Sequence, residues 1–336
     1  MPDSKAGASM GAHFQVRLKR CGQIIAALAI VAAPPVQGAD WPARPIRIVA
    51  PFGPAGAADK FARVLADYLP AEIKQPVVVE NRGGGGGIVG SAQVARAEPD
   101  GYTLLISSLA SQAIAPALSP NPGFDSLRDF THIVYLGGPP IGWVVTPPSG
   151  LHSVDAVFAK ARQSAFPGYA SSGIGTLGHL VAEVAMQQAG VRMSHIPYNT
   201  AALADIIAGH VPLASYAWSS VIGQVQAGAL RAIAISTATR RPDFPDVPTF
   251  REQGFDIVAS TWFALSGPAH MPKEIIERLN REVGRIMERP EVRLRFAQDA
   301  IEFRSMTPNE LTRLFEVEIA RWGVVVRDSG LKRGLE

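Results

Sequence analysis

From Trp41 onward, short apolar runs alternate with longer stretches in which apolar residues recur every three or four positions. The short runs predict buried strands at 46–50, 77–79, 102–106, 142–145, 168–170, 195–198 and 230–235. The longer stretches predict helices at 61–69, 154–162 and 177–189, and further helices after Pro272 and Thr307. This alternation is typical of an α/β fold in which the strands of each sheet run mostly parallel.

Two of the predicted helices carry capping signals at their first turn. Asp59 precedes the first helical stripe and is expected to be its N-cap residue. Thr307-Pro-Asn-Glu310 forms a capping box that places Pro308 at the first helical position. Both signals predict where the chain enters a helix.

The first 38 residues have the pattern of a secretory signal peptide. Basic residues precede an apolar stretch at 23–33, and the small residues after it indicate cleavage near Gly38 or Ala39. An apolar stretch of about eleven residues is too short to span a bilayer, and an uncleaved membrane anchor is the alternative. Met1 and Met10 are both candidate start residues. The signal predicts export to the periplasm.

Charge and cysteine content exclude several classes of protein. The chain has a net charge of +3, all of which lies in the signal region, so the rest is close to neutral and lacks the basic surface that nucleic-acid binding needs. Cys21 is the only cysteine and leaves with the signal, which excludes disulfides, zinc–thiolate sites and cysteine nucleophiles. His195 and His210 lack the spacing of metal-ligand pairs, and neither a metal nor a cofactor is expected.

The loop between the first strand and the first helix is the most informative local feature. It comprises Phe52, Gly53, Pro54, Ala55, Gly56, Ala57, Ala58 and Asp59. Small residues expose backbone N–H groups beside the positive end of a helix, which suits a carboxylate or a phosphate. An ordinary tight turn between strand and helix is the alternative, and the local sequence favours neither.

Two other small-residue segments have weaker signals. The glycine run at 83–87 lacks the Gly-Lys pair of a phosphate-binding P-loop, so it predicts a flexible or crowded turn. The loop at 171–176 precedes the helix that carries His179, and its hydroxyl and N–H groups could bind a second anion. An exported hydrolase that uses Ser171 and His179 is the alternative, although no Gly-x-Ser-x-Gly pattern is present in the sequence.

A series of ordered motifs across residues 41–330 resembles one receptor family. The motifs are Pro51-Phe-Gly-Pro-Ala-Gly-Ala-Ala-Asp59, Pro76-Val-Val-Val-Glu-Asn-Arg82, Pro99-Asp-Gly-Tyr-Thr103, Tyr169-Ala-Ser-Ser172, His195-Ile-Pro-Tyr198, Pro245-Asp-Val-Pro-Thr249 and Thr261-Trp-Phe263. From these motifs the chain is identified as a member of the substrate-binding proteins of tripartite tricarboxylate transporters, also called Bug-type receptors.

The resemblance implies a solute receptor with no catalysis. Its fold would be α/β, a two-lobed clamshell of the type 2 periplasmic-binding-protein kind in which each lobe is a mostly parallel sheet flanked by helices. Lobe 1 is expected at 39–141 plus 265–336 and lobe 2 at 142–264, after a signal peptide at 1–38. The receptor would act as a monomer, bind a small organic carboxylate between the lobes, and deliver it to a membrane permease of the tripartite tricarboxylate type.

The resemblance also implies which residues hold the ligand. The first loop would grip one carboxylate through its N–H groups, and the second lobe would meet the ligand's other end. The second-lobe set is Ser171, Ser172, Thr176, His179, Tyr198, Asn199, Tyr216 and Trp218, and the expected site also includes Ser107 and Ser108.

The second lobe departs from the family pattern at two places. Asn199-Thr200 stands where Lys-Gly is usual, and Tyr216-Ala217 followed by Trp218 stands where an Asp-Asn pair is frequent. The loss of a lysine and an acid with a gain of aromatic residues predicts a less polar or aromatic ligand, and substitution without changed specificity is the alternative. A receptor that senses the same ligand for a membrane kinase would have the same sequence features.

Overall fold

The computed structural model describes residues 41–54, 56–163, 166, 168–198, 202–301 and 303–328. The predicted signal peptide at 1–38 and two of the expected ligand-binding residues, Ala55 and Asn199, lie outside the described residues.

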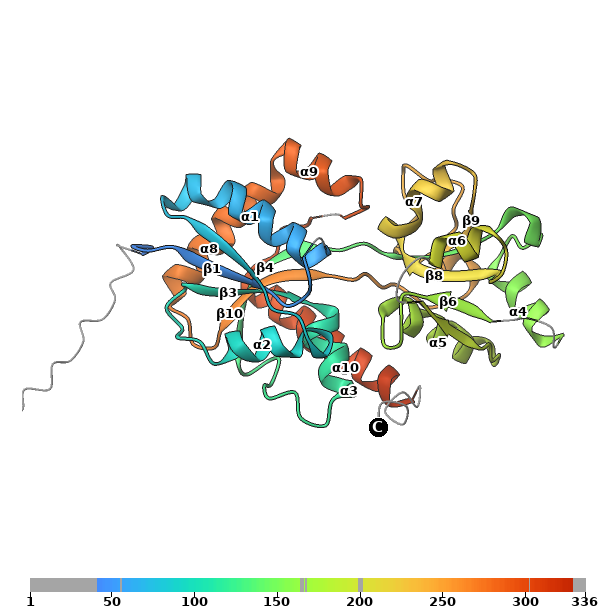
Figure 1. Cartoon of the computed structure of the whole chain (residues 1–336), viewed down its shortest axis with the longest axis horizontal. Helices are drawn as coiled ribbons and strands as arrows, with labels where there is room; N and C mark the ends of the chain where they lie inside the picture. The colour runs from blue at the N-terminus through green and yellow to red at the C-terminus, as the bar shows by residue number, and fades with distance from the viewer. Residues whose placement is uncertain are drawn as a thin grey trace, which may run out of the picture. The chain divides into compact units, whose positions relative to one another are not determined.

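Two five-stranded sheets form the framework of the chain (Figure 1). The first sheet has the order β2 (Val77–Asn81), β1 (Ile46–Ala50), β3 (Thr103–Ser108), β10 (Phe263–Pro268) and β4 (Phe130–Gly137). The second has the order β7 (His195–Pro197), β6 (Tyr169–Ser171), β8 (Leu213–Ala217), β5 (Ile141–Val145) and β9 (Arg231–Ile235).

In each sheet one strand is antiparallel to the other four. β1 pairs in parallel with β2 and β3, and β10 is antiparallel to both β3 and β4. In the second sheet β6 pairs in parallel with β7 and β8, and β5 is antiparallel to both β8 and β9. The predicted α/β class with mostly parallel strand direction is confirmed, although the ladders are mixed.

Helices cover both sheets. Those beside the first sheet are α1 (Ala57–Ile73), α2 (Ile88–Ala95), α3 (Ala115–Leu118), α8 (Lys273–Glu288), α9 (Pro290–Ala297) and α10 (Pro308–Asp328). Those beside the second are α4 (Val154–Arg162), α5 (Leu177–Ala189), α6 (Ala202–Ile207) and α7 (Trp218–Gln226). Short turns occur at η1 (Gly85–Gly87), η3 (Pro147–Ser149) and η4 (Arg251–Gln253), and η2 (Ala110–Ile114) is a π-helical turn between β3 and α3.

The core of the first sheet lies under α1, α8 and α9. Phe61 of α1 is buried and stacks on Phe296 of α9 with ring centroids 4.5 Å apart, and Phe263 of β10 is 5.1 Å away. Burial of such aromatic side chains is the main source of stability in a core of this kind. The apolar stripe of α1 therefore fixes the helix whose first turn follows the first candidate loop.

The predicted capping box at the start of α10 is confirmed. The Thr307 N–H donates to Glu310 Oε2 at 2.8 Å, and the Glu310 N–H donates to Thr307 Oγ1 at 3.3 Å. Further along α10, Glu318 accepts hydrogen bonds from the indole N–H groups of Trp262 and Trp322, each at 3.0 Å. These bonds tie α10 to the segment that precedes β10.

Two extended segments join the sheets, one from β4 to β5 and one leading into β10 (Figure 1). They touch through their backbones, because Pro140 and Ser260 form an isolated bridge. A Cβ added at Gly138 would lie 2.0 Å from the carbonyl oxygen of Thr261, so only glycine fits there.

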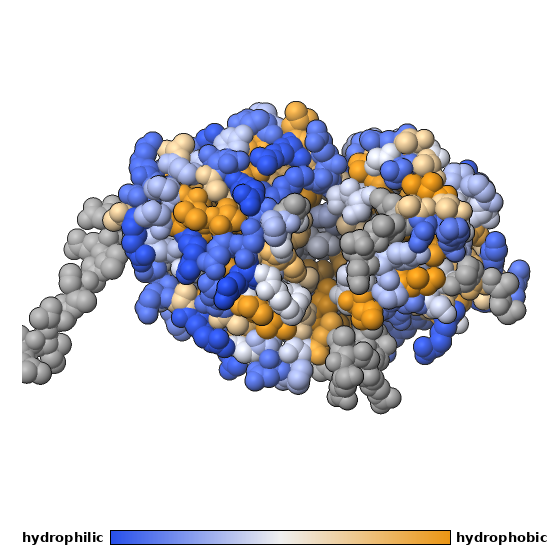
Figure 2. Space-filling view, viewed as in Figure 1, coloured by the Kyte–Doolittle hydropathy of each residue, from blue (hydrophilic) through white to orange (hydrophobic). Residues whose placement is uncertain are grey.

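No helix within the described ranges combines the length and the hydropathy that crossing a membrane requires. The face shown in Figure 2 is a mosaic in which apolar patches are scattered among hydrophilic residues.

Candidate ligand-binding site

The first candidate loop connects β1 to α1. The N-cap residue of α1 is Gly56, which has an extended backbone (φ −77°, ψ 173°) and no capping side chain. The prediction that Asp59 is the N-cap is therefore wrong, because the small residues let the helix begin at Ala57 and leave Asp59 in its first turn. Among the described residues, the N–H groups of Ala57 and Ala58 have no protein acceptor; Ala57 is exposed, so its N–H is available to an anion, whereas Ala58 is buried.

Asp59 fixes the loop to the neighbouring strand. It is 3% exposed, and its carboxylate accepts hydrogen bonds from Asn81 Nδ2 at 2.9 Å and from Arg63 Nε at 2.8 Å. Asn81 also lies 3.3 Å from the carbonyl oxygen of Phe52, to which its amide donates. The buried carboxylate therefore positions the loop through the Asn81 side chain.

The glycine run packs against this loop. A Cβ at Gly83 would lie 3.6 Å from the Gly53 nitrogen, and a Cβ at Gly87, whose φ is +100°, would lie 2.6 Å from Ser111 Cβ. Only glycine combines that backbone conformation with so close an approach. The crowded-turn interpretation of residues 83–87 is confirmed.

Ser107 and Ser108 lie at the end of β3 and are almost completely buried. The Ser107 hydroxyl is 2.7 Å from the Ser266 hydroxyl and 3.1 Å from the carbonyl oxygen of Ala264. The Ser108 hydroxyl is 3.2 Å from that of Ser111. In this structure the Ser107 hydroxyl joins β3 to β10, and the Ser108 hydroxyl joins β3 to η2.

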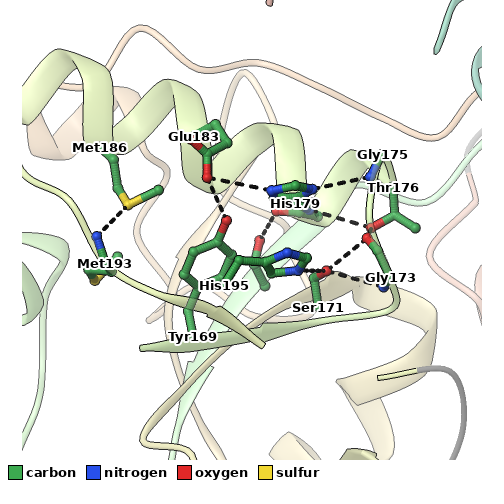
Figure 3. A network of polar contacts seen from close by, with 12 residues as sticks. Tyr169, Ser171, Gly173, Gly175, Thr176, His179, Glu183, Met186, Met193 and His195 are labelled. Carbon is green, nitrogen blue, oxygen red and sulfur yellow. Dashed lines mark hydrogen bonds and ion pairs between the residues drawn. The ribbon is translucent and has the colours of Figure 1, made fainter. Parts of the chain in front are cut away.

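The second candidate loop connects β6 to α5 (Figure 3). Thr176 is the N-cap residue of α5: its hydroxyl accepts from the His179 N–H and donates to the carbonyl oxygen of Gly173 at 2.8 Å. The Gly173 N–H donates to Ser171 Oγ at 3.2 Å, and the Gly175 N–H donates to His179 Nδ1 at 3.1 Å. Much of the loop's hydrogen-bonding capacity is therefore used within the loop.

A cluster of rings and one carboxylate lies against this loop (Figure 3). His195 Nε2 is 2.7 Å from Ser171 Oγ, and its ring stacks on that of His179 with centroids 3.8 Å apart. Glu183 accepts a hydrogen bond from the Tyr169 hydroxyl at 2.9 Å and lies 3.5 Å from His179 Nε2. Because Gly175 donates to Nδ1 of His179, the proton of that ring is on Nε2 and faces Glu183.

Burial and hydrogen bonding perturb two titratable groups of the cluster. Burial, with a smaller contribution from His179, lowers the pKa of His195 to about 4, so this ring is neutral. Burial alone would raise the pKa of Glu183, but hydrogen bonds from His179 and Tyr169 outweigh it, and the pKa is lowered. Glu183, in the second turn of α5, is therefore ionised.

The geometry required by the hydrolase alternative is incomplete. Ser171 lies close to His195, but Glu183 bonds to His179 and Tyr169, and no carboxylate in the part of the chain that the structure describes is hydrogen-bonded to His195. Ser171 also has no exposed surface, whereas a nucleophile must reach its substrate. In this structure the polar groups of the cluster bond to one another.

Three aromatic residues were expected near the ligand. The Tyr198 N–H donates to the carbonyl oxygen of Ser171 at 3.0 Å, which places Tyr198 beside the second loop. Tyr216 is 6% exposed, and its hydroxyl has no hydrogen-bond partner among the residues described. Trp218 is completely buried and packs edge-to-face on Phe244 at 5.0 Å, so its side chain does not reach a surface in this structure.

The glycine run beside the first loop and the second loop both pack against the segment formed by η2 and α3. A Cβ at Gly86, in the glycine run beside the first loop, would lie 2.9 Å from Ala115 Cβ. A Cβ at Gly175, in the second loop, would lie 2.9 Å from Leu118 Cδ1. The structure thus brings 83–87, which packs on the first loop, and 171–176 against one short helical segment.

The described cavities lie outside these loops, and two of them adjoin α10. One of about 720 Å³ occurs where the joining segments meet α10, and Pro140, Trp262 and Glu318 are in its wall. The other, of about 610 Å³, lies between α5 and the end of α10, and His195 and Glu183 line it. Within the described residues, no group of His, Cys, Asp and Glu side chains is arranged to hold a metal ion.

The model of the tripartite tricarboxylate transporter family receptor matches residues 61–331. The chain belongs to this family. This receptor is 36% identical over 307 residues to Protein BugT of Bordetella pertussis, covering 89% of this chain and 94% of BugT. It is 34% identical over 291 residues to a UPF0065 protein from the tcbD-tcbE intergenic region of Pseudomonas sp. strain P51, covering 84% and 85% of the two chains.

Solved structures of similar proteins support the same family and fold. Rpa4515 of R. palustris, solved with adipate, has a TM-score of 0.75 and 30% identity, covering 87% of this receptor and 99% of that chain. The periplasmic binding protein BugD has a TM-score of 0.72 and 27% identity, with coverage of 87% and 99%. MatC of Rhodopseudomonas palustris, solved with bound malate, has a TM-score of 0.71 and 26% identity, with coverage of 85% and 99%. The predicted family and two-lobed α/β fold are confirmed.

Three residues near the loops of this receptor were not among the expected ligand-binding residues. Asn81 holds Asp59 and the first loop, and the exposed Arg82 follows it, with its N–H bonded to the carbonyl oxygen of Ala50 at 2.8 Å. Ile174 is 51% exposed within the second loop. A bulky apolar residue between two glycines was the sequence signal that could have singled out Ile174.

Proposed function

We propose that the chain is a periplasmic receptor that binds a small organic carboxylate between two lobes and delivers it unchanged to a membrane permease of the tripartite tricarboxylate type. The lobes are those expected from the sequence, 39–141 plus 265–336 and 142–264. Export depends on the signal peptide at 1–38. The family match supports a receptor, and relatives solved with adipate and malate support a carboxylate ligand.

The observation that carries the proposal is the open N-terminus of α1. A helix N-terminus carries a partial positive charge and unsatisfied N–H groups, and it binds anions most readily when no side chain caps it. Gly56 cannot cap α1, and the donors of Ala57 and Ala58 are unused within the described residues. Asp59 and Asn81 hold this loop in place, so it needs little reorganisation when ligand binds.

The second lobe supplies the other wall of the proposed site. Its candidates in this structure are the exposed Ser172 and Ile174 of the second loop, with Tyr198 beside them and the unsatisfied hydroxyl of Tyr216. Closure of the lobes around the ligand is the motion expected of such a receptor.

Substitution Ala57→Pro tests the proposed carboxylate site. Proline is tolerated at the first position of a helix, and the extended backbone of Gly56 suits the residue before a proline, so the helix should form normally. The variant lacks one N–H donor. Loss of a hydrogen bond to a charged group costs about 1.5–3 kcal/mol, so carboxylate affinity measured by calorimetry should fall by about tenfold or more.

Lys273→Pro is the matched control, because Lys273 is the first residue of α8 and is exposed. It should keep the affinity of the unmodified protein. Equal affinity in all three proteins would place the carboxylate elsewhere, and conversion of the carboxylate to a product would contradict a receptor. Delivery is measured as uptake by cells that contain the permease, with and without the receptor.

A further inference from the structure

The joining segments run between two sides of the space that separates the sheets. On one side are the loops that follow β1 in the first sheet and β6 in the second, which are the two candidate loops. On the other side are the edge strands β4 and β9, which lie beyond β10 and β5 in the two strand orders. Since the segments connect β4 to β5 and lead into β10, they separate the proposed ligand site from the edge formed by β4 and β9.

The cavity of about 720 Å³ lies on the side of these edge strands. Its wall contains Tyr135 of β4 and Leu314 of α10 from the first lobe. From the second lobe it contains Val258 and the segment 236–242, which follows β9. The two lobes are therefore not closely packed against each other here, so this side has room to widen or narrow when they move.

Arg321 of α10 bonds across the edge of this cavity to the second lobe. Its Nη1 donates to the carbonyl oxygen of Val258 at 2.7 Å. Val258 is part of the second lobe's body, because the preceding Ile257 is buried in the core around β5 and the N–H of the following Ala259 donates to the carbonyl oxygen of Ser236 at 2.9 Å. The bond thus connects α10 of the first lobe to the second lobe.

The first lobe holds Arg321 in position for this bond. Its guanidinium lies 4.9 Å from the centroid of the Trp322 ring, and its Nη1 lies 3.9 Å from Glu318 Oε1. Glu318 is itself fixed, because its other carboxylate oxygen accepts the indole N–H groups of Trp262 and Trp322. A side chain that is already oriented loses less conformational entropy when it makes a hydrogen bond.

Closure of the lobes must act on this bond. Rotation about the joining segments that brings the two candidate loops together moves the opposite side apart. Val258 and α10 lie on that opposite side, so closure lengthens the contact between Arg321 and the Val258 carbonyl oxygen. A bond that is made in one arrangement and weakened in another shifts the equilibrium towards the first.

We infer that Arg321 is a positioning residue that restrains closure of the lobes and thereby lowers the affinity of the receptor for its carboxylate. This inference rests on the proposed function. Arg321 acts without touching the ligand, because the joining segments lie between the two. It gives a role to the hydrogen bonds that fix Glu318, Trp262 and Trp322 beside the joining segments.

Arg321→Met tests the restraint, because it removes the guanidinium donors and keeps an unbranched apolar side chain on α10. Binding of malate, adipate, hexanoate and benzoate is measured by calorimetry at neutral pH. We expect each acid that binds the unmodified protein to bind Arg321→Met about threefold to tenfold tighter, since loss of one hydrogen bond raises the population of a minor closed form by that factor. Arg321→Lys keeps a charged donor and should change the affinity less.

Arg313→Met is the matched control, because Arg313 is an exposed arginine on the same helix. It loses the same charge, and it should bind each acid no tighter than the unmodified protein does. Urea denaturation of all the variants separates restraint from a purely structural role, which would lower the free energy of unfolding without raising affinity. Equal or weaker binding by Arg321→Met would overturn the inference and leave the proposed function standing. Failure of all four acids to bind the unmodified protein would overturn both.

Discussion

The contact between Asp59 and Asn81 should determine both the stability of the first loop and its affinity for a carboxylate. In Asp59→Ala the Asn81 amide loses its 2.9 Å bond to the buried carboxylate and keeps only its longer bond to the Phe52 carbonyl oxygen. The loop then loses its fixed connection to the first turn of α1.

The expected cost follows from the partners of Asp59. A hydrogen bond to a buried charged group contributes about 1.5–3 kcal/mol, and an acid in the first turn of a helix adds about 0.3–1 kcal/mol. The Arg63 side chain is 54% exposed, so solvent screens its ion pair and we assign it no share. The free energy of unfolding should therefore fall by about 2–4 kcal/mol.

Urea denaturation followed by circular dichroism measures this loss, and calorimetry measures carboxylate affinity. Asp67→Ala is the control on the same helix, because Asp67 is 61% exposed and, among the residues that the structure describes, its one ion pair is the 3.6 Å contact with Arg295. We expect the control to change stability by less than about 0.5 kcal/mol and to bind normally. If Asp59→Ala is no less stable than Asp67→Ala and binds carboxylate equally well, the positioning role of Asp59 is refuted.

Two further predictions concern the cluster under the second loop and the glycine run. Burial lowers the folded-state pKa of His195 to about 4 from an ordinary 6.5, so the unfolded chain binds more protons between these values and stability should fall as the pH drops from 6.5 to 4. When unfolding is measured across that range, His195→Gln should lose less stability than the unmodified protein. His132, whose pKa is lowered to about 3 by burial, contributes equally in both proteins. Identical pH profiles would contradict the role assigned to His195. Gly87→Ala should lower the free energy of unfolding by about 1–3 kcal/mol because φ is +100° and the new Cβ would collide with Ser111. Gly150→Ala, at a φ of +70° with open space around it, should cost less, and an equal loss in urea denaturation would rule out crowding as the cause.

Local sequence patterns determined much of the fold. The strands near 46–50 and 102–106 and the helices at 154–162 and 177–189 follow from apolar periodicity, which acts over a few residues. The capping box at Thr307 placed the start of α10 at Pro308, since its hydrogen bonds span only three residues. Ordered motifs along the chain were sufficient to identify the family.

Other strands depended on long-range pairing. β10 contains Ser266, Gly267 and Pro268, a composition that does not predict a strand. It becomes one because it pairs with β3 and β4, whose residues lie more than a hundred positions earlier in the sequence. Its antiparallel direction, and that of β5, could not be read from periodicity.

The roles of the site residues were decided by the tertiary structure. The sequence showed Asp59, His179 and Trp218 as polar or aromatic residues beside candidate loops, and it could not show which atoms are buried. Folding places Asp59 against Asn81, His179 against His195, and Trp218 inside the core. Each contact joins residues that are distant in the chain, so packing alone decides whether a side chain faces a ligand or supports the loop that does.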